Sequence, residues 1–376
     1  MVKLNPKVSI IIPVYNGANF LAEAIDSALA QTYSNIEVVV VNDGSKDNGK
    51  TEKVALSYGD DIEYYIKENG GVASALNFGI QKMTGEYFSW LSHDDLYERT
   101  KIEEEVRYLL NQPAPDSTII ACNSVALFEN GIKKKEKINH VVFNDYFDIF
   151  LGASAKTGLN GCSLLIPRNV LIDSGGFNIN LPVTQDYDLW FRLKDKCKFT
   201  LLDRHLVVYR HHDMQDSVLK SDTSLIAGDE LRARILRSVS KKYFANFIRA
   251  SKKNEKWIWE SYSTYKSMGY IKTSLEILRL SADLSPKGSI KALGEVTLWE
   301  GIYRNHGYAT DTSNQSVVKR IEGLEEFSNN KIYLGYVSMK RMSQIGSYIE
   351  SIKNDGLGFF IHKAGRKLIR ILRKLV

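Results

Sequence analysis

Three apolar runs near the start of the chain constrain its fold more than any other feature. VSIIIPV (8–14), IEVVVV (36–41) and EYFSWLS (86–92) are rich in β-branched and aromatic residues, as strands buried in a sheet are. Between them, segments such as ANFLAEAIDSALAQ (18–31) space their apolar residues as amphipathic helices do. This alternation predicts an α/β domain with a mostly parallel sheet. Ligands of such sheets bind beyond the carboxyl ends of the strands.

The character of the chain changes in its second half. From about Asp229 onward the segments have helical spacing, are rich in Lys, Glu, Tyr and Trp, and carry few strand patterns. We therefore expect an α/β domain over 1–225, an α-helical region over 226–358 and a separate basic segment over 359–376. The helical region is also a candidate surface for formation of a homo-oligomer.

The basic segment carries the charge of the chain. The formal net charge is +6, and the last sixteen residues, IHKAGRKLIRILRKLV, hold six Lys or Arg and no acid. On a helical period the apolar residues share one face and the cations the other, as in a helix lying on an anionic membrane surface. The alternative is a terminal helix that packs its apolar face on its own domain. The tail lacks interleaved aromatic residues, which disfavours nucleic acid as a partner.

Composition also indicates a compartment. Cys122, Cys162 and Cys197 lack CxxC spacing, which fits a reducing environment without disulfides or structural zinc. The first apolar run is short and broken at Pro13, unlike a signal peptide. No run reaches the ~18 apolar residues that a membrane-spanning helix needs. We expect a cytoplasmic protein, held peripherally at the inner face of the cell membrane by its tail.

Polar residues follow two of the expected strands. In VVNDGSKD (40–47), Asn42 and Asp43 form a tight turn whose amide and carboxylate could bind a flat heterocycle, although an ordinary Asn-Asp-Gly turn has the same sequence. In WLSHDD (90–95), Asp94 and Asp95 could hold Mg²⁺ or Mn²⁺ together with substrate phosphates. Alternatively, Asp95 caps a helix over LYERTKIEEEV.

Two later motifs add acid–base and cationic groups. TQDYDLWFRL (184–193) predicts a helix with Asp186 at its start, where the carboxylate could take a proton from a hydroxyl. Asp188 is expected to be a solvated residue of the first turn. VVYRHH (207–212) places Arg210 and His212 just after a strand, as contacts to a diphosphate or a metal.

Taken in order, these motifs resemble family 2 glycosyltransferases of the GT-A fold, of the type that builds bacterial surface polysaccharides. The resemblance covers roughly residues 6 to 218 and includes IIPVYNGANF (11–20), GGVASALNFGI (70–80) and GGFN (175–178) besides the motifs above. It implies a Rossmann-like catalytic domain. It also implies an inverting transfer of a sugar from a nucleotide diphosphate sugar, most often UDP-linked, with a divalent metal.

The resemblance assigns donor-binding roles residue by residue. Pro13 and Tyr15 match the residues that flank the nucleoside, with the Tyr15 ring near the base. Asn42 and Asp43 match the turn that recognises the base, where the family often has Asp-Asp. The stretch that lines the nucleotide contributes Gly70, Gly71 and Asn77.

The metal motif departs from the family pattern. The family commonly reads Leu-Asp-x-Asp-Asp, whereas Ser92 here replaces the first acid. Asp94 aligns with the metal-binding carboxylate, Asp95 follows it, and the ribose contact falls to His93 or Ser92. Asp186 matches the general base, with Gln185 where Glu is common. His212 matches a metal or diphosphate contact, and Arg210 lies beside it.

The acceptor implied is a hydroxyl of a glycan or of a lipid-linked glycan, in lipopolysaccharide O-antigen or capsule assembly. Two other classes share parts of the pattern. A nucleotidyltransferase would show a basic, glycine-rich loop after the first strand, but IIPVYNGANF has one glycine and no cation. A non-catalytic glycan-binding or scaffolding protein would keep the fold without needing Asp186.

Overall fold

The computed structural model describes residues 4–138, 159–181, 183–193, 196–213, 215, 221–250, 258, 260–262, 265 and 270–281. The chain divides into two compact units. One comprises Met1–Ser238 with Glu260–Ser274, and the other Val239–Trp259 with Leu275–Val376. The division at residue 225 stays a prediction, and the basic tail lies outside the described residues.

Strands β1 to β4 form the parallel half of a mixed sheet. β1 pairs with β2 from Val8↔Ile36 to Val14↔Asn42, β3 lies outside β2, and β4 lies on the other side of β1. Because all four run the same way, their carboxyl ends meet at one edge of the sheet. The bounds are Val8–Val14 for β1, Ile36–Asn42 for β2, Glu63–Ile66 for β3 and Tyr87–Trp90 for β4.

Helices connect these strands and cover the sheet. Every residue of β1 is buried, which explains its unbroken apolar pattern. Gly79 packs so closely on the sheet that a Cβ there would lie 2.4 Å from Cγ2 of Ile11, so a glycine is needed. The connecting helices are α1 (Leu21–Leu29), α2 (Lys50–Leu56) and α3 (Val72–Lys82), with a 3₁₀ turn, η1, at Gly59–Asp61.

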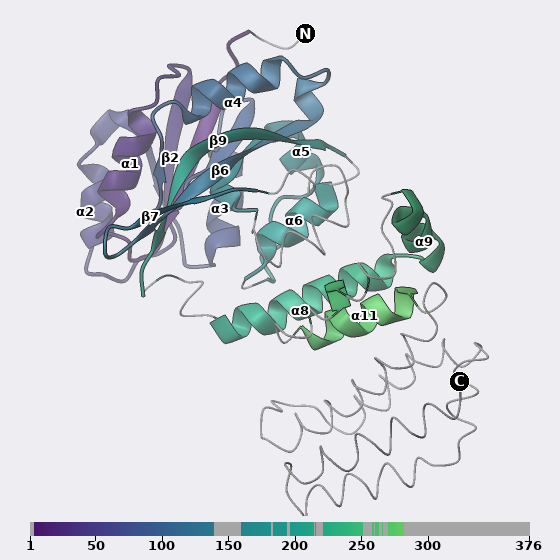
Figure 1. Ribbon diagram of the computed structural model, residues 1–376. Helices are drawn as coiled ribbons and strands as arrows, with labels where there is room; N and C mark the ends of the chain where they lie inside the picture. Colours follow the sequence, from purple (N-terminus) through teal and green to yellow (C-terminus); the bar gives the residue numbers. More distant parts are fainter. Residues whose placement is uncertain are drawn as a thin grey trace, which may run out of the picture. The chain divides into compact units, whose positions relative to one another are not determined.

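The second half of the sheet mixes directions. β8 runs antiparallel to both β4 and β6, whereas the long strands β6 and β9, which lie side by side in Figure 1, are parallel to each other. The expected parallel sheet is therefore confirmed for β1 to β4. The full order is β3-β2-β1-β4-β8-β6-β9-β5, with β7 beside β6. The bounds are Leu96–Tyr97 (β5), Thr118–Phe128 (β6), Lys133–Glu136 (β7), Leu164–Pro167 (β8) and Lys198–His211 (β9).

The lysine-rich segment NGIKKKEK (130–137) includes the short strand β7. Lys133–Glu136 form β7, which pairs antiparallel with β6 and is exposed along its length. Lysines along an edge strand keep it soluble and discourage pairing with other chains.

The helix expected at TQDYDLWFRL is confirmed as α6 (Gln185–Leu193). The other helices are α4 (Lys101–Leu110), α5 (Arg168–Asp173), α8 (Ser221–Ser238), α9 (Lys241–Ala250) and α11 (Ile271–Ser281), with 3₁₀ turns η2 (Pro115–Ser117) and η6 (Gly161–Ser163). Within the described ranges, no helix has the length and apolar character to cross a membrane.

Candidate active site

The carboxyl ends of β1 and β2 form a polar edge of the sheet. The amide N–H of Asp43 donates to the carbonyl of Val14 at 2.8 Å, which joins the chain after β2 to the end of β1. Tyr15 follows β1 directly and is 42% exposed, so its ring is open to a ligand. Pro13, by contrast, is buried inside β1 opposite Val41.

Asn42 shapes the turn after β2. Its Nδ2 donates to the Tyr64 hydroxyl at 2.9 Å, and its Oδ1 accepts the Ser45 N–H at 2.9 Å. The side chain is fully buried. Both ends of the amide are therefore used inside the protein, as in an Asx turn that fixes the backbone of Gly44 and Ser45.

Asp43 connects this turn to the start of α3. Its carboxylate accepts N–H groups from Gly70 at 3.1 Å and Gly71 at 2.7 Å, and pairs with the Lys67 ammonium at 2.7 Å. Gly71 has φ +82°, a backbone conformation that favours glycine. The structure brings Asp43 together with Gly70 and Gly71. Nothing in the sequence indicated the role of Lys67, which belongs to no motif.

The segment after β4 lies against the segment after β1. A Cβ on Gly17 would lie 2.2 Å from Cδ2 of His93, so the imidazole packs directly on the glycine backbone. Ser92, which stands where the resemblance expects an acid, contacts the Cys162 thiol through both its N–H and its hydroxyl at 3.3 Å. Burial raises the pKa of Cys162 well above its usual value, so this neighbour of Ser92 is a neutral thiol.

The two adjacent carboxylates of WLSHDD have different surroundings. Asp94 lies 3.1 Å from Nε2 of His212. Asp95 is 2% exposed and accepts the backbone N–H of Arg210 at 3.1 Å. Burial, and then the neighbouring charge of Asp94, raise the pKa of Asp95 well above its usual value.

The alternative role of Asp95 as a helix cap is wrong. β5 follows the carboxylate pair, and α4 begins only at Lys101, after Thr100. Asp95 instead holds the end of β9, because its oxygen accepts an N–H that lies just beyond the β5–β9 pairing.

Asp94 and His212 are the residues best placed to hold a divalent cation. An oxygen and an imidazole nitrogen 3.1 Å apart suit Mn²⁺ or Mg²⁺ when phosphate oxygens supply further ligands. Among the residues described, no three His, Cys, Asp or Glu side chains converge in a way that could hold a metal ion.

Arg210 contacts α1 in this structure. Its guanidinium pairs with Glu23 and lies 4.9 Å from the centre of the Phe20 ring, and that ring is 5.0 Å from the His212 ring. Neither Glu23 nor Phe20 was assigned a role from the sequence, because Glu23 lies on α1 outside any motif and Phe20, the last residue of IIPVYNGANF, directly precedes that helix. Arg210 would have to exchange Glu23 for a diphosphate in order to bind one.

Asp186 is the second residue of α6 and is half-buried. Burial raises its pKa to about 6, against the N–H of Tyr187 and the charge of Arg232, which both lower it. A carboxylate with this pKa is ionised at neutral pH and still a useful proton acceptor. Thr184, just before the helix, has φ +67°, a strained conformation for a β-branched residue.

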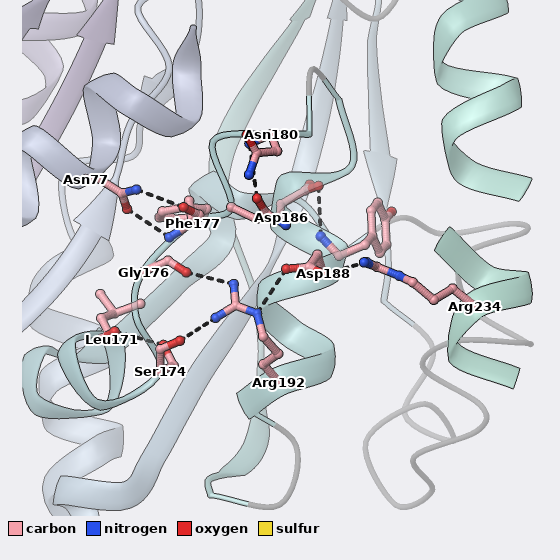
Figure 2. Close-up of polar contacts among 12 residues, drawn as sticks. Asn77, Leu171, Ser174, Gly176, Phe177, Asn180, Asp186, Asp188, Arg192 and Arg234 are labelled. Atoms are coloured by element: carbon pink, nitrogen blue, oxygen red, sulfur yellow. Dashed lines mark hydrogen bonds and ion pairs between the residues drawn. The ribbon is translucent and has the colours of Figure 1, made fainter. Parts of the chain in front are cut away.

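Asp188 is not the solvated first-turn residue that its position predicts. It is buried, and its two oxygens accept hydrogen bonds from Arg192 Nε at 2.9 Å and from Arg234 at 2.8 Å (Figure 2). Asn77, which was expected in the stretch that lines the nucleotide, uses its amide for two 2.8 Å hydrogen bonds with the backbone of Phe177, in the loop before α6.

Comparisons with known proteins identify the family of this chain. The model of the family "Glycosyl transferase family 2" matches residues 9–164. An uncharacterized glycosyltransferase of Rickettsia felis is 53% identical over 213 residues, covering 56% of this chain and 35% of that protein. One from Rickettsia typhi is 39% identical over 314 residues, covering 82% of this chain and 94% of that protein.

Solved structures share the fold. That of S. aureus TarS residues 1–349 with UDP-GlcNAc has a TM-score of 0.52 at 16% identity, and the match covers 82% of this chain and 95% of that one. The chain spans about a third of the length of the first Rickettsia relatives that it matches. Its sheet has the GT-A arrangement expected from the motifs, and the near full-length match to the R. typhi protein shows that this chain belongs to the family 2 glycosyltransferases.

Proposed function

We propose that this chain is an inverting glycosyltransferase, which moves a sugar from a nucleotide diphosphate sugar to a hydroxyl of a glycan acceptor. The observation that carries the proposal is Asp186, a half-buried carboxylate with a pKa of about 6 at the start of α6. The loop before that helix is bonded through Asn77 to α3, which packs on the parallel strands whose edge carries Asp43 and Asp94.

The donor is assigned to the carboxyl edge of β1, β2 and β4. The exposed ring of Tyr15 would pack on the base, and the turn at Asp43, which the N–H groups of Gly70 and Gly71 hold in place, would recognise the base edge. Asn42 would act by holding that turn, since its amide is fully bonded. A UDP-linked donor is the first choice, and the related fold of TarS with UDP-GlcNAc supports it.

Asp94 and His212 would hold Mn²⁺ or Mg²⁺, with oxygens of the diphosphate completing the ligands. When bound, the cation would neutralise the charge that grows on the leaving diphosphate. Asp95 would support this site by accepting the backbone N–H of Arg210, which fixes the chain just before His212. Arg210 would leave Glu23 for the diphosphate, and His93 would lie along the ribose.

The reaction is a single displacement. The Asp186 carboxylate accepts the proton of the acceptor hydroxyl, whose oxygen attacks the anomeric carbon as the bond from that carbon to the diphosphate breaks. The new bond forms on the face opposite the leaving group, so the anomeric configuration inverts. A pKa of about 6 lets Asp186 take this proton at neutral pH.

The acceptor is proposed to be lipid-linked, in assembly of a surface polysaccharide such as O-antigen or capsule. This follows from the basic amphipathic tail at 361–376, which would hold the protein at the inner face of the membrane. Flotation with anionic vesicles tests it, using the whole chain and a form ending at Gly358. The shorter form should lose binding, and equal binding of both forms would refute the membrane role.

The activity itself is tested by a donor screen. The protein is incubated with UDP-, GDP- and dTDP-sugars in Mn²⁺ or Mg²⁺, and release of the nucleoside diphosphate is measured. We expect release from at least one donor, above a metal-free control. If no donor is turned over under any of these conditions, the catalytic proposal fails, and a glycan-binding role on the same fold becomes the better account.

A further inference from the structure

Asp188 is a buried junction between α6 and α8. Its side chain is 9% exposed, and each of its oxygens accepts a hydrogen bond from a different arginine. Arg192 lies one turn further along α6, whereas Arg234 lies on α8 in the same compact unit. A buried carboxylate costs free energy unless it is paired, so the two arginines offset the cost of burying Asp188.

From Asp188 the contacts continue into the loop before α6. The guanidinium of Arg192 donates to the carbonyls of Ser174 at 2.6 Å and Gly176 at 2.7 Å. The next residue, Phe177, makes its two backbone hydrogen bonds to Asn77 on α3 (Figure 2). The helix that carries Asp186 is therefore bonded on one side, through this loop, to α3, which packs on β1 and β2.

On the other side, α6 is bonded to α8 through Arg234. Asp186 and Asp188 are separated by one residue, so a shift of the first turn that loosens Asp188 also moves Asp186. We propose that Arg234 is a positioning residue for the general base, acting through Asp188 and not on substrate. This inference rests on the proposed function for its kinetic consequence, but its structural part stands on the contacts alone.

The Arg234 pair differs from an ordinary surface ion pair on the side of its carboxylate, although the Arg234 side chain itself is 53% exposed. Arg237, on the same helix, lies 3.4 Å from Glu230, and both side chains are about half exposed, at 50% and 46%. Pairs of that kind contribute little to stability. Asp188 is only 9% exposed and lies 2.8 Å from Arg234, so loss of this arginine leaves one buried oxygen without its charged donor. Arg237→Met is therefore a matched control on the same helix.

The kinetic test compares Arg234→Met, Arg234→Lys and Arg237→Met at saturating acceptor. We expect Arg234→Met to lower kcat roughly tenfold with donor KM unchanged, since misplacement of a reacting group by ~1 Å costs up to ~100-fold. Arg234 uses a single N–H toward Asp188, so lysine can replace it and should restore about half of kcat. Arg237→Met should match the wild type.

Three kinetic outcomes would overturn the inference: equal kcat in Arg234→Met and Arg237→Met, a loss that lysine does not restore, or a loss that lies in donor KM. A second arm needs no turnover. Amide hydrogen exchange of residues 185–193 should speed up in Arg234→Met and not in Arg237→Met. If the wild type turns over no donor, the proposed function fails, and this exchange result alone decides whether Arg234 holds α6.

Discussion

Two regions of the site are held in place in different ways. One is the carboxyl edge of β1, β2 and β4, to which the donor is assigned (the donor edge), and the other is α6, which carries the general base Asp186 (the base helix). At the donor edge, strand pairing sets the positions of the side chains: Asp43 binds Gly70 and Gly71 beyond the ends of neighbouring parallel strands, and Asp94 meets His212 just after β9, which pairs with β5. α6 instead depends on side chains from distant parts of the chain, with Asn77 one hundred residues before Phe177 and Arg234 46 residues after Asp188. The donor edge is thus a product of sheet topology, whereas the position of the base depends on a few individual hydrogen bonds.

The first way to sharpen this comparison is to remove the base itself. Asp186→Asn keeps the size of the side chain but not the proton acceptor, so kcat for transfer should fall about 10³-fold, within the usual 10²–10⁴ for a general base. Donor affinity should be unchanged, because the donor is assigned to the other region. Transfer kinetics and donor titration calorimetry measure the two quantities. A variant that transfers sugar at the wild-type rate would remove Asp186 from the mechanism.

Removal of the Asp94 carboxylate at the donor edge should instead weaken the binding of metal and donor. Asp94→Asn leaves His212 as one end of the pair and should lower metal-dependent donor turnover about 100-fold, the upper range for loss of a metal ligand or its supporting contacts. Titration with Mn²⁺ in the presence of donor should show a weaker apparent metal affinity. An unchanged metal dependence would show that the cation, if needed, is held elsewhere.

A smaller effect, on stability, should follow from disturbing the hydrogen bonds between Asn77 on α3 and Phe177 in the loop before α6. Gly176 has φ +69°, and a Cβ there would lie 2.5 Å from Oδ1 of Asn77, whereas Gly175 has φ +78° with no atom within 4 Å. Gly175→Ala should cost about 1 kcal/mol of unfolding free energy from backbone strain alone. Gly176→Ala should cost about 2–3 kcal/mol, because it also disrupts the buried bonds of Asn77.

Urea denaturation of both glycine variants measures this difference. Equal losses of stability would mean that the Asn77 side chain moves aside without cost, and that the link is weaker than its hydrogen bonds suggest. Gly175→Ala serves as the internal control for the conformational strain that the two positions share.

The sequence predicted the donor edge better than the base helix for the same physical reason. Strand periodicity places Tyr15, Asp43 and Asp94 at the ends of β1, β2 and β4, and parallel pairing then brings those ends to one edge. No period relates Asp188 to Arg234, so its burial was missed and it was taken for a solvated residue.

Lys67 and Glu23 were missed for a similar reason. Each is a single charged residue outside any motif, and its partner is set by tertiary packing. The helix cap expected at Asp95 failed because a two-residue strand, β5, comes before α4, and two residues are too few for a period to be recognised.

The central claim is that Asp186 is the proton acceptor of the reaction, and the pH dependence of transfer tests it most directly. Burial holds the pKa of Asp186 at about 6, above the usual value for Asp, so the fraction of ionised base falls as the pH drops through that value. The rate of transfer at subsaturating acceptor should therefore fall about tenfold per pH unit below pH ~6 and level off above it. A rate that stays constant from pH 8 down to pH 5 would contradict the account.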